Sequence, residues 1–111
     1  MKHIVTTVVT ALTLLATSAQ AEFYSGNEML TRMNNKENSI VDNMLSLGYV
    51  AGVHDTNNGA RFCTPTTATS GQVRDVVHKW VLANPEWRDY SGDMVVTFAL
   101  SSAWPCPKKT K

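Results

Sequence analysis

Residues 69–81 have the sequence TSGQVRDVVHKWV, which carries the clearest amphipathic pattern in the chain. Its apolar side chains recur at i, i+3, i+4, i+7 and i+8, which predicts an amphipathic α-helix. They are Val73, Val76, Val77, Trp80 and Val81. Thr69 and Gln72 form a capping box at its start, because each side chain can bind a free backbone N–H of the first turn. Asn84-Pro85 ends the helix, since a residue before proline is disfavoured in the helical region.

The segment before this helix predicts a longer and more apolar one. Asn34 or Asn35 can cap its start. Residues 57–59, Asn-Asn-Gly, can end it shortly after Asp55, because these residue types readily adopt left-handed conformations. From Met44 onward the helix is apolar almost all round, so we expect it to be buried, either centrally or at a subunit interface.

Two glycines lie four residues apart on this second helix, Gly48 and Gly52. Because glycine has no side chain, another backbone could approach closely on their face. Each glycine also lowers helix stability, so packing must compensate. We favour close packing inside one subunit over a contact between two copies.

Two further helices complete the predicted fold. Ser25 and Glu28 make a capping box for a short helix that runs to about Asn34. A fourth helix begins near Ser91 and is stopped by Pro105. It carries Met94, Val95, Val96, Phe98, Ala99 and Leu100. We therefore predict an all-α fold, a small bundle of about four helices.

Residues 1–21 have the pattern of a secretory signal peptide. A basic start is followed by an apolar stretch from Ile4 to Ala16 and by Ala19-Gln20-Ala21, a small-x-small cleavage pattern. The apolar run of about thirteen residues is shorter than the roughly twenty that span a bilayer. We expect cleavage after Ala21 and export of a domain of residues 22–111 to the periplasm, with no membrane contact after cleavage.

The sequence contains two cysteines, Cys63 and Cys106. In an oxidising compartment two cysteines of a small domain are expected to pair. In the chain-entropy model this closure would restrict the unfolded chain by roughly 4 kcal/mol. The alternative is a reactive thiol, which would need a nearby base and an unpaired cysteine.

The charge balance argues against a nucleic-acid partner. Ten basic and nine acidic residues give a formal net charge of +1. A nucleic-acid binder normally presents a basic stripe, whereas Lys108, Lys109 and Lys111 form only a short basic tail.

Several short motifs follow one another in the order found in a known family. The motifs are residues 25–30, similar to an opening GNxLL segment, residues 48–55, similar to GYIxGVxD, and then residues 62–65, 72–81, 84–85 and 103–106. Together they resemble the Rap/Tai family of type VI secretion immunity proteins.

The resemblance implies a small, all-helical periplasmic protein, often a homodimer. Its partner would be a peptidoglycan amidase effector of the cysteine peptidase type, whose substrate cleft the immunity protein blocks. Cys63 and Cys106 match two cysteines of the family. Many members carry a further pair, where this chain has Met33 and either Ser46 or Met44.

No group of residues in the sequence predicts catalysis. His54 and Asp55 are neighbours on a helix and so leave it about a hundred degrees apart, and His78 lies on a different helix. The sequence has no spaced ligand pattern such as HxxxH for a metal. We therefore expect no enzyme activity, no metal and no cofactor.

Two connections carry the candidate partner-binding residues. Trp87, Arg88 and Tyr90 belong to the residue types that dominate binding hot spots, and they follow the helix that ends at Asn84-Pro85. The polar loop from His54 to Arg61, which includes Asp55, is the second connection. The alternative is that Trp87 and Tyr90 cover the core while Arg88 packs locally.

The predicted function is inhibition of a periplasmic amidase by a rigid loop. The alternative is a general envelope stress protein, a small chaperone that exposes apolar surface on acidification. Such a switch needs titratable groups at an interface. Only His54 and His78 in the predicted mature chain could supply it near neutral pH.

Overall fold

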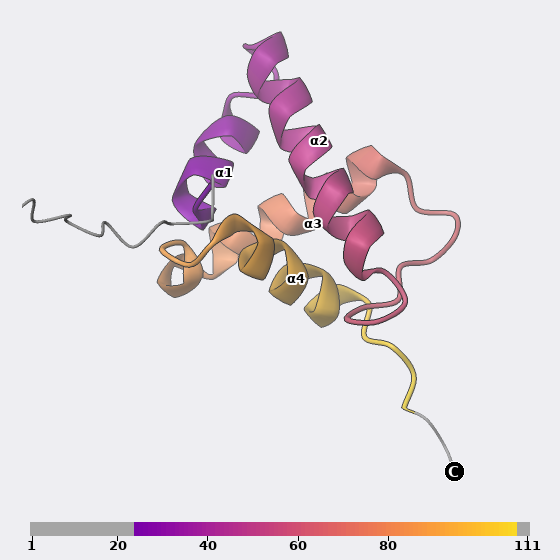
Figure 1. The fold of residues 1–111 in the computed structure, drawn as a ribbon. Coiled ribbons are helices and arrows are strands. Elements are labelled where there is room, and N and C mark those ends of the chain that lie inside the picture. Colours follow the sequence, from indigo (N-terminus) through magenta and orange to yellow (C-terminus); the bar gives the residue numbers. More distant parts are fainter. Residues whose placement is uncertain (1–23, 109–111) are drawn as a thin grey trace, which may run out of the picture.

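The computed structural model describes residues 24–108, which form four α-helices and one short 3-10 helix (Figure 1). They are α1 (Gly26–Asn34), α2 (Ile40–Asn57), α3 (Ser70–Ala83), η1 (Pro85–Trp87) and α4 (Gly92–Ala103). The prediction of an all-α bundle of about four helices is confirmed. The predicted signal peptide, residues 1–21, lies outside the described residues.

Three of the helices begin at a hydroxyl cap. Ser25 Oγ accepts a hydrogen bond from Glu28 N at 3.2 Å before α1, and Thr69 Oγ1 accepts one from Gln72 N at 3.1 Å before α3. Each bond satisfies a first-turn N–H that has no partner within its helix. Both predicted helix starts are therefore confirmed.

The start of α2 differs from the prediction. Its N-cap is Ser39, whose Oγ accepts from Asp42 N at 3.2 Å, and neither Asn34 nor Asn35 takes this place. Asn34 is the last residue of α1, and the backbone N–H of Asn35 caps that helix instead. The chain then needs a turn before α2 can run in a new direction.

The core lies between α3 and the other three helices. Val73, Val77 and Val81 of α3 are buried, as the apolar spacing of this helix predicted. Partly buried Val76 and Trp80 border this stripe. The remaining buried apolar residues are Met29, Met33, Val50, Phe62, Val95, Val96, Ala99 and Leu100.

The expectation that α2 is buried is wrong for burial inside the subunit, whereas burial at a subunit interface stays a prediction. Only Ser46 and Val50 of this helix are buried, and the large side chains of its first half face outward. The residue exposures are 78% for Ile40, 60% for Val41, 60% for Met44 and 40% for Leu45. The helix therefore lies on the outside of the bundle and contributes one narrow stripe to the core.

The glycines that allow close packing are not the two we expected. A Cβ added at Gly48 or Gly52 would meet no atom within 4 Å, so close packing at these positions inside the subunit is wrong. At Gly26 an added Cβ would lie 2.9 Å from the carbonyl oxygen of Arg88. The start of α1 is pressed against the segment before α4, where Gly26 N donates to Tyr90 O at 2.9 Å and Gly92 N to Tyr24 O at 2.6 Å.

Cys63 and Cys106 form the predicted disulfide, with their Cα atoms 4.8 Å apart. It joins the connection between α2 and α3 to the segment that follows α4. Among the described residues, no helix is long and apolar enough to cross a membrane.

Candidate functional site

The connection after α2 forms a tight turn, residues 58–64, which we name the braced loop. Gly59 N donates to Phe62 O at 2.7 Å, and Thr64 N donates to Asn58 Oδ1 at 3.0 Å. Gly59 has a φ of 89°, a left-handed value that favours glycine. Phe62 is completely buried and anchors the loop, whereas residues 58–61 are exposed at its tip.

The braced loop is also attached to the end of α4. Besides the disulfide, Cys63 N donates to Trp104 O at 2.8 Å and Ser101 Oγ donates to Arg61 O at 2.9 Å. The loop is thus held from α2, from the core and from α4. A segment fixed in this way loses little conformational entropy when it binds a partner.

His54 and Asp55, predicted to point apart, are joined by a hydrogen bond. The distance from His54 Nδ1 to Asp55 Oδ1 is 2.8 Å, and His54 Nε2 lies 3.1 Å from Thr64 Oγ1. The hundred-degree separation applies to the Cα–Cβ bonds only, and rotation about the side-chain bonds brings the two polar groups together.

The hydroxyl of Thr64, the imidazole of His54 and the carboxylate of Asp55 follow one another as in a catalytic triad. The surroundings of these groups instead favour a structural role, in which they attach the loop to α2. The backbone N–H of Thr64 donates to Asn58 Oδ1, and the Asp55 side chain is 80% exposed. The His54 ring also lies 5.6 Å from the Phe62 ring. His54 therefore fastens the braced loop to α2.

The second candidate connection, residues 84–91, is built around Trp87. The Trp87 ring centroid lies 5.0 Å from that of Tyr90 and 5.2 Å from that of Phe98 on α4. Trp87 is half-buried, and Tyr90 is 42% exposed. The aromatic cluster thus covers one edge of the core and leaves part of Tyr90 at the surface.

Arg88 closes the end of α3. Its Nε donates to Val81 O and its Nη2 to Leu82 O, both at 3.0 Å. These carbonyls belong to the last turn of the helix, where a cation is favourable. Arg88 thus packs locally, which was the alternative interpretation of this residue.

The two connections lie at opposite ends of α4. Residues 84–91 precede its first residue, Gly92, while the braced loop is bonded to Ser101 and Trp104 at its last turn. A helix of this length separates its ends by about 17 Å. The predicted partner-binding residues therefore belong to two surfaces, with His54, Asp55 and Arg61 on one and Trp87, Arg88 and Tyr90 on the other.

A comparison with family models adds one match. A model of the Rap1a immunity proteins matches residues 16–106, a range that includes both connections and both cysteines. The chain belongs to the Rap1a immunity protein family. No curated protein matches the chain. Because immunity proteins act by binding a toxin, membership of the Rap1a family supports a protein effector as the partner.

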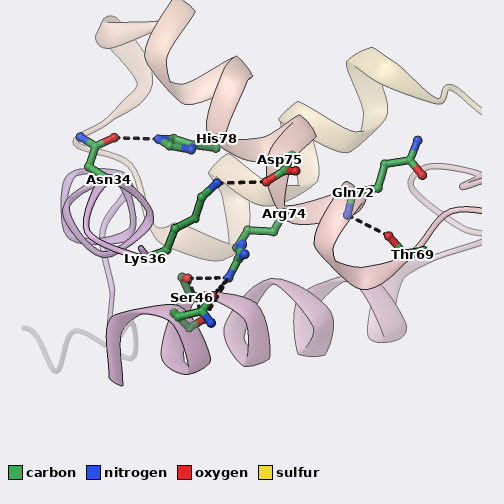
Figure 2. Close-up of polar contacts among 9 residues, drawn as sticks. Asn34, Lys36, Ser46, Thr69, Gln72, Arg74, Asp75 and His78 are labelled. Carbon is green, nitrogen blue, oxygen red and sulfur yellow. Dashed lines mark hydrogen bonds and ion pairs between the residues drawn. The ribbon is translucent and has the colours of Figure 1, made fainter. Parts of the chain in front are cut away.

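This Rap1a family member also contains a polar cluster that the sequence did not predict (Figure 2). Arg74 Nη1 donates to the backbone oxygen of Asn43 at 3.0 Å, to its Oδ1 at 2.6 Å and to the buried Ser46 Oγ at 3.4 Å. Among the described residues, Arg74 Nε has no hydrogen-bond partner. The cluster joins α3 to α2. The signal in the sequence was that polar Asn43 and Ser46 lie among the apolar residues of the helix.

Two further contacts join the end of α1 to α3 (Figure 2). Lys36 Nζ lies 3.1 Å from Asp75 Oδ1, and His78 Nε2 lies 2.7 Å from Asn34 Oδ1. Burial lowers the pKa of His78 below its ordinary value, and the positive charge of Lys36 lowers it further. Across residues 24–108 of this Rap1a protein, no three His, Cys, Asp or Glu side chains are grouped to hold a metal ion.

Proposed function

We propose that this chain is a periplasmic immunity protein that binds a type VI secreted peptidoglycan amidase and occludes its substrate cleft. The single observation that carries the proposal is the braced loop. Its tip presents Asn58, Gly59, Ala60 and Arg61 to solvent on a backbone held by the disulfide and by hydrogen bonds to α4. Family membership supports the immunity role, and the amidase is the partner that the sequence motifs suggest.

The shape of the tip suits entry into a peptidase cleft. Gly59 and Ala60 have the smallest side chains, so the backbone itself can approach catalytic residues closely. Arg61 is exposed beside them and offers a charged group for orientation. In this proposal the chain acts by steric exclusion, with no catalytic step of its own.

Asp55 extends the proposed contact surface beyond the tip. Its carboxylate is exposed next to the braced loop and is held by His54. In the proposed interface Asp55 and Arg61 meet the effector, and His54 keeps the loop in place. Tyr90, at the other end of α4, would contact the same effector only where the interface extends along that helix.

The experiment is an inhibition assay with candidate type VI amidases and the disulfide-bonded protein. Ala60→Trp should abolish inhibition, because the bulky side chain would keep the tip of the loop out of the amidase cleft. The fold should tolerate the change, because Ala60 is exposed. Leu82→Trp, at an exposed position on α3, is the matched control and should inhibit like the natural protein. Full inhibition by Ala60→Trp would contradict the proposal that the braced loop is the inhibitory surface. If the protein bound none of the amidases tightly, the proposal of an amidase as the partner would be contradicted.

One observation favours the alternative, an envelope stress protein, and that is the exposed apolar side of α2. Suppression of the aggregation of unfolded periplasmic proteins by the purified chain would support it. An acid switch would have to act through His54, which is bonded to Thr64, or through His78, which is bonded to Asn34. The immunity role needs no such switch and therefore stays our proposal.

A further inference from the structure

The tip of the braced loop contains Asn58-Gly59, the one Asn-Gly step in the sequence. Both residues are exposed, and Gly59 has no side chain to shield its backbone nitrogen. The carboxamide of an asparagine that precedes glycine is open to attack by that nitrogen, because the reaction closes a five-membered ring. Asn58 therefore has the chemical surroundings of a residue that can modify itself.

The reaction is a deamidation through a cyclic imide. The Gly59 nitrogen gives its proton to solvent and bonds to Asn58 Cγ, while the bond from Cγ to Nδ2 breaks and Nδ2 takes up a proton and leaves as ammonia. Water, the co-reactant, then opens the ring. Cleavage of the bond between the nitrogen and Cγ leaves aspartate, whereas cleavage of the bond between the nitrogen and the main-chain carbonyl carbon leaves isoaspartate.

The closed loop keeps the reacting atoms apart. Ring closure needs Asn58 Cβ and the Gly59 nitrogen to be nearly eclipsed about the Cα–C bond, and the ψ of 133° at Asn58 turns them well away from each other. Asn58 Oδ1 accepts from Thr64 N at 3.0 Å, which fixes the carboxamide. Gly59 N–H donates to Phe62 O at 2.7 Å, so its proton is harder to remove. The ring can form only after the loop opens.

The attachments of the braced loop control how often it opens. The disulfide between Cys63 and Cys106 joins the loop covalently to the segment after α4. Cys63 N donates to Trp104 O at 2.8 Å, and Ser101 Oγ donates to Arg61 O at 2.9 Å. A loop can open without unfolding of the whole chain, and the population of its open state rises when an attachment is removed.

We propose that Asn58 is a modification site whose conversion to aspartate and isoaspartate is slow while the braced loop is closed and becomes fast when the disulfide is lost. In isoaspartate the main chain passes through the former side chain, so Oδ1 becomes the oxygen of a peptide bond. Thr64 N then loses the side-chain acceptor that closes the loop. The damage persists even if the cysteines pair again. This inference does not depend on the proposed function.

Asn38 provides an internal comparison for the rate at Asn58. It is also exposed, but it precedes Ser39 and lies before α2, outside the attachments of the braced loop. Trypsin should release both asparagines in one peptide, residues 37–61, because this segment begins after Lys36 and ends at Arg61. Fragment masses of that peptide then give the conversion at each position separately.

The test is incubation of the protein at mildly alkaline pH in three forms, namely disulfide-bonded, Cys63→Ala/Cys106→Ala and unfolded in urea. Conversion of Asn58 should be about tenfold faster or more in the cysteine variant than in the disulfide-bonded protein, and fastest in urea. Enzymatic methylation of isoaspartate distinguishes it from aspartate. In a folded cysteine variant the rate at Asn38 should change much less than the rate at Asn58.

A matched pair of serines tests one attachment while the disulfide stays in place. Ser101→Ala removes the hydrogen bond to Arg61 O and should raise the rate at Asn58 about twofold or more. Ser102→Ala, at the exposed next position, is the control and should leave the rate unchanged. Circular dichroism of each variant shows whether it remains folded.

Three results would overturn the proposal. Absence of isoaspartate at Asn58 in urea would show that this residue is not a modification site. Equal rates in the disulfide-bonded and the urea-unfolded protein would show that the closed loop gives no protection. A folded cysteine variant with the rate of the natural protein would show that the disulfide does not control the reaction. If the cysteine variant unfolds as a whole, the serine pair decides, and equal rates in Ser101→Ala and Ser102→Ala would contradict the proposal.

Discussion

The two longest helices, α2 and α3, are both rich in apolar residues, yet they relate to the core in different ways. α3 buries Val73, Val77 and Val81 in one stripe and turns Asp75 and Lys79 outward. α2 buries Ser46 and Val50 and exposes the large side chains of its first half. Burial follows apolar spacing only where polar residues mark the opposite face, because apolar content alone does not say which side meets the core.

The difference extends to how each helix is held. α3 packs against α1, α2 and α4 through its own valines. α2 depends more on attachments near its ends, with Asp42 bonded to Arg32 at the start and the braced loop after Asn57.

Removal of the disulfide should have the largest effect and should loosen α2 more than α3. The closed loop has a sequence separation of 43 residues, and its opening should cost roughly 4 kcal/mol of the free energy of unfolding. Urea denaturation of Cys63→Ala/Cys106→Ala against the natural protein measures the loss. Hydrogen exchange should show weaker protection in the last turns of α2, and equal loss in α3 would contradict the comparison.

A matched pair of valines tests burial directly. Val77→Ala should lower the free energy of unfolding by about 2 kcal/mol, because Val77 is fully buried in α3 and its removal leaves a cavity. Val41→Ala should change it by less than about 0.5 kcal/mol, since Val41 is largely exposed. Both values come from denaturation at low protein concentration. Similar losses in the two variants would mean that α2 is packed in solution.

A matched pair of glycines should shift stability in opposite directions. Gly26→Ala should destabilise the protein by about 1–2 kcal/mol, because the new Cβ would press on the backbone of Arg88. Gly52→Ala should stabilise it by up to about 1 kcal/mol, since the position is helical and open. Melting temperatures of the two variants in dilute solution check the signs. A destabilised Gly52→Ala would show that an atom does meet this position.

The smallest effect concerns pH. His78 on α3 has a pKa below its ordinary value of 6.5, so the unfolded chain binds a proton more readily than the folded one. The contribution of neutral His78 to the free energy of unfolding is complete above pH 6.5. It should be lost as the pH falls through the lowered pKa. Stability of the natural protein between pH 7.5 and 5 should therefore decline more than that of His78→Gln, which keeps a donor for Asn34. Equal slopes would exclude His78 as the cause.

Much of the fold could be predicted because helix caps and apolar spacing depend on residues that are close together in the sequence. Ser25 and Thr69 cap their helices, and the apolar spacing of α3 selects its buried residues. The predicted start of α2 is wrong because asparagine favours helix N-caps in general, so its residue type does not show which helix end it serves. Only the three-dimensional course of the chain shows that Asn35 serves the end of α1.

The candidate site was predicted only in outline. The cysteine pair predicted which loop the disulfide holds, and exposed Arg61 lies in this braced loop. Exposed Asp55 lies close to the loop in the sequence. The roles of His54 and Arg88 could not be foreseen, because they depend on Thr64 and on the carbonyls of Val81 and Leu82, which the fold brings within reach. Residue type alone does not separate a hot-spot arginine from one that closes a helix.

The pairing of the start of α1 with residues 88–92 has a consequence for folding. Gly92 N donates to Tyr24 O, and Asn27 N donates to Arg88 O at 2.7 Å, so the first described residues bond to a segment made much later. Contacts between positions so far apart in the chain are slow to form. The first helix can contact α2 early, through Arg32 and Asp42, but its start stays unpaired until nearly the whole polypeptide is available.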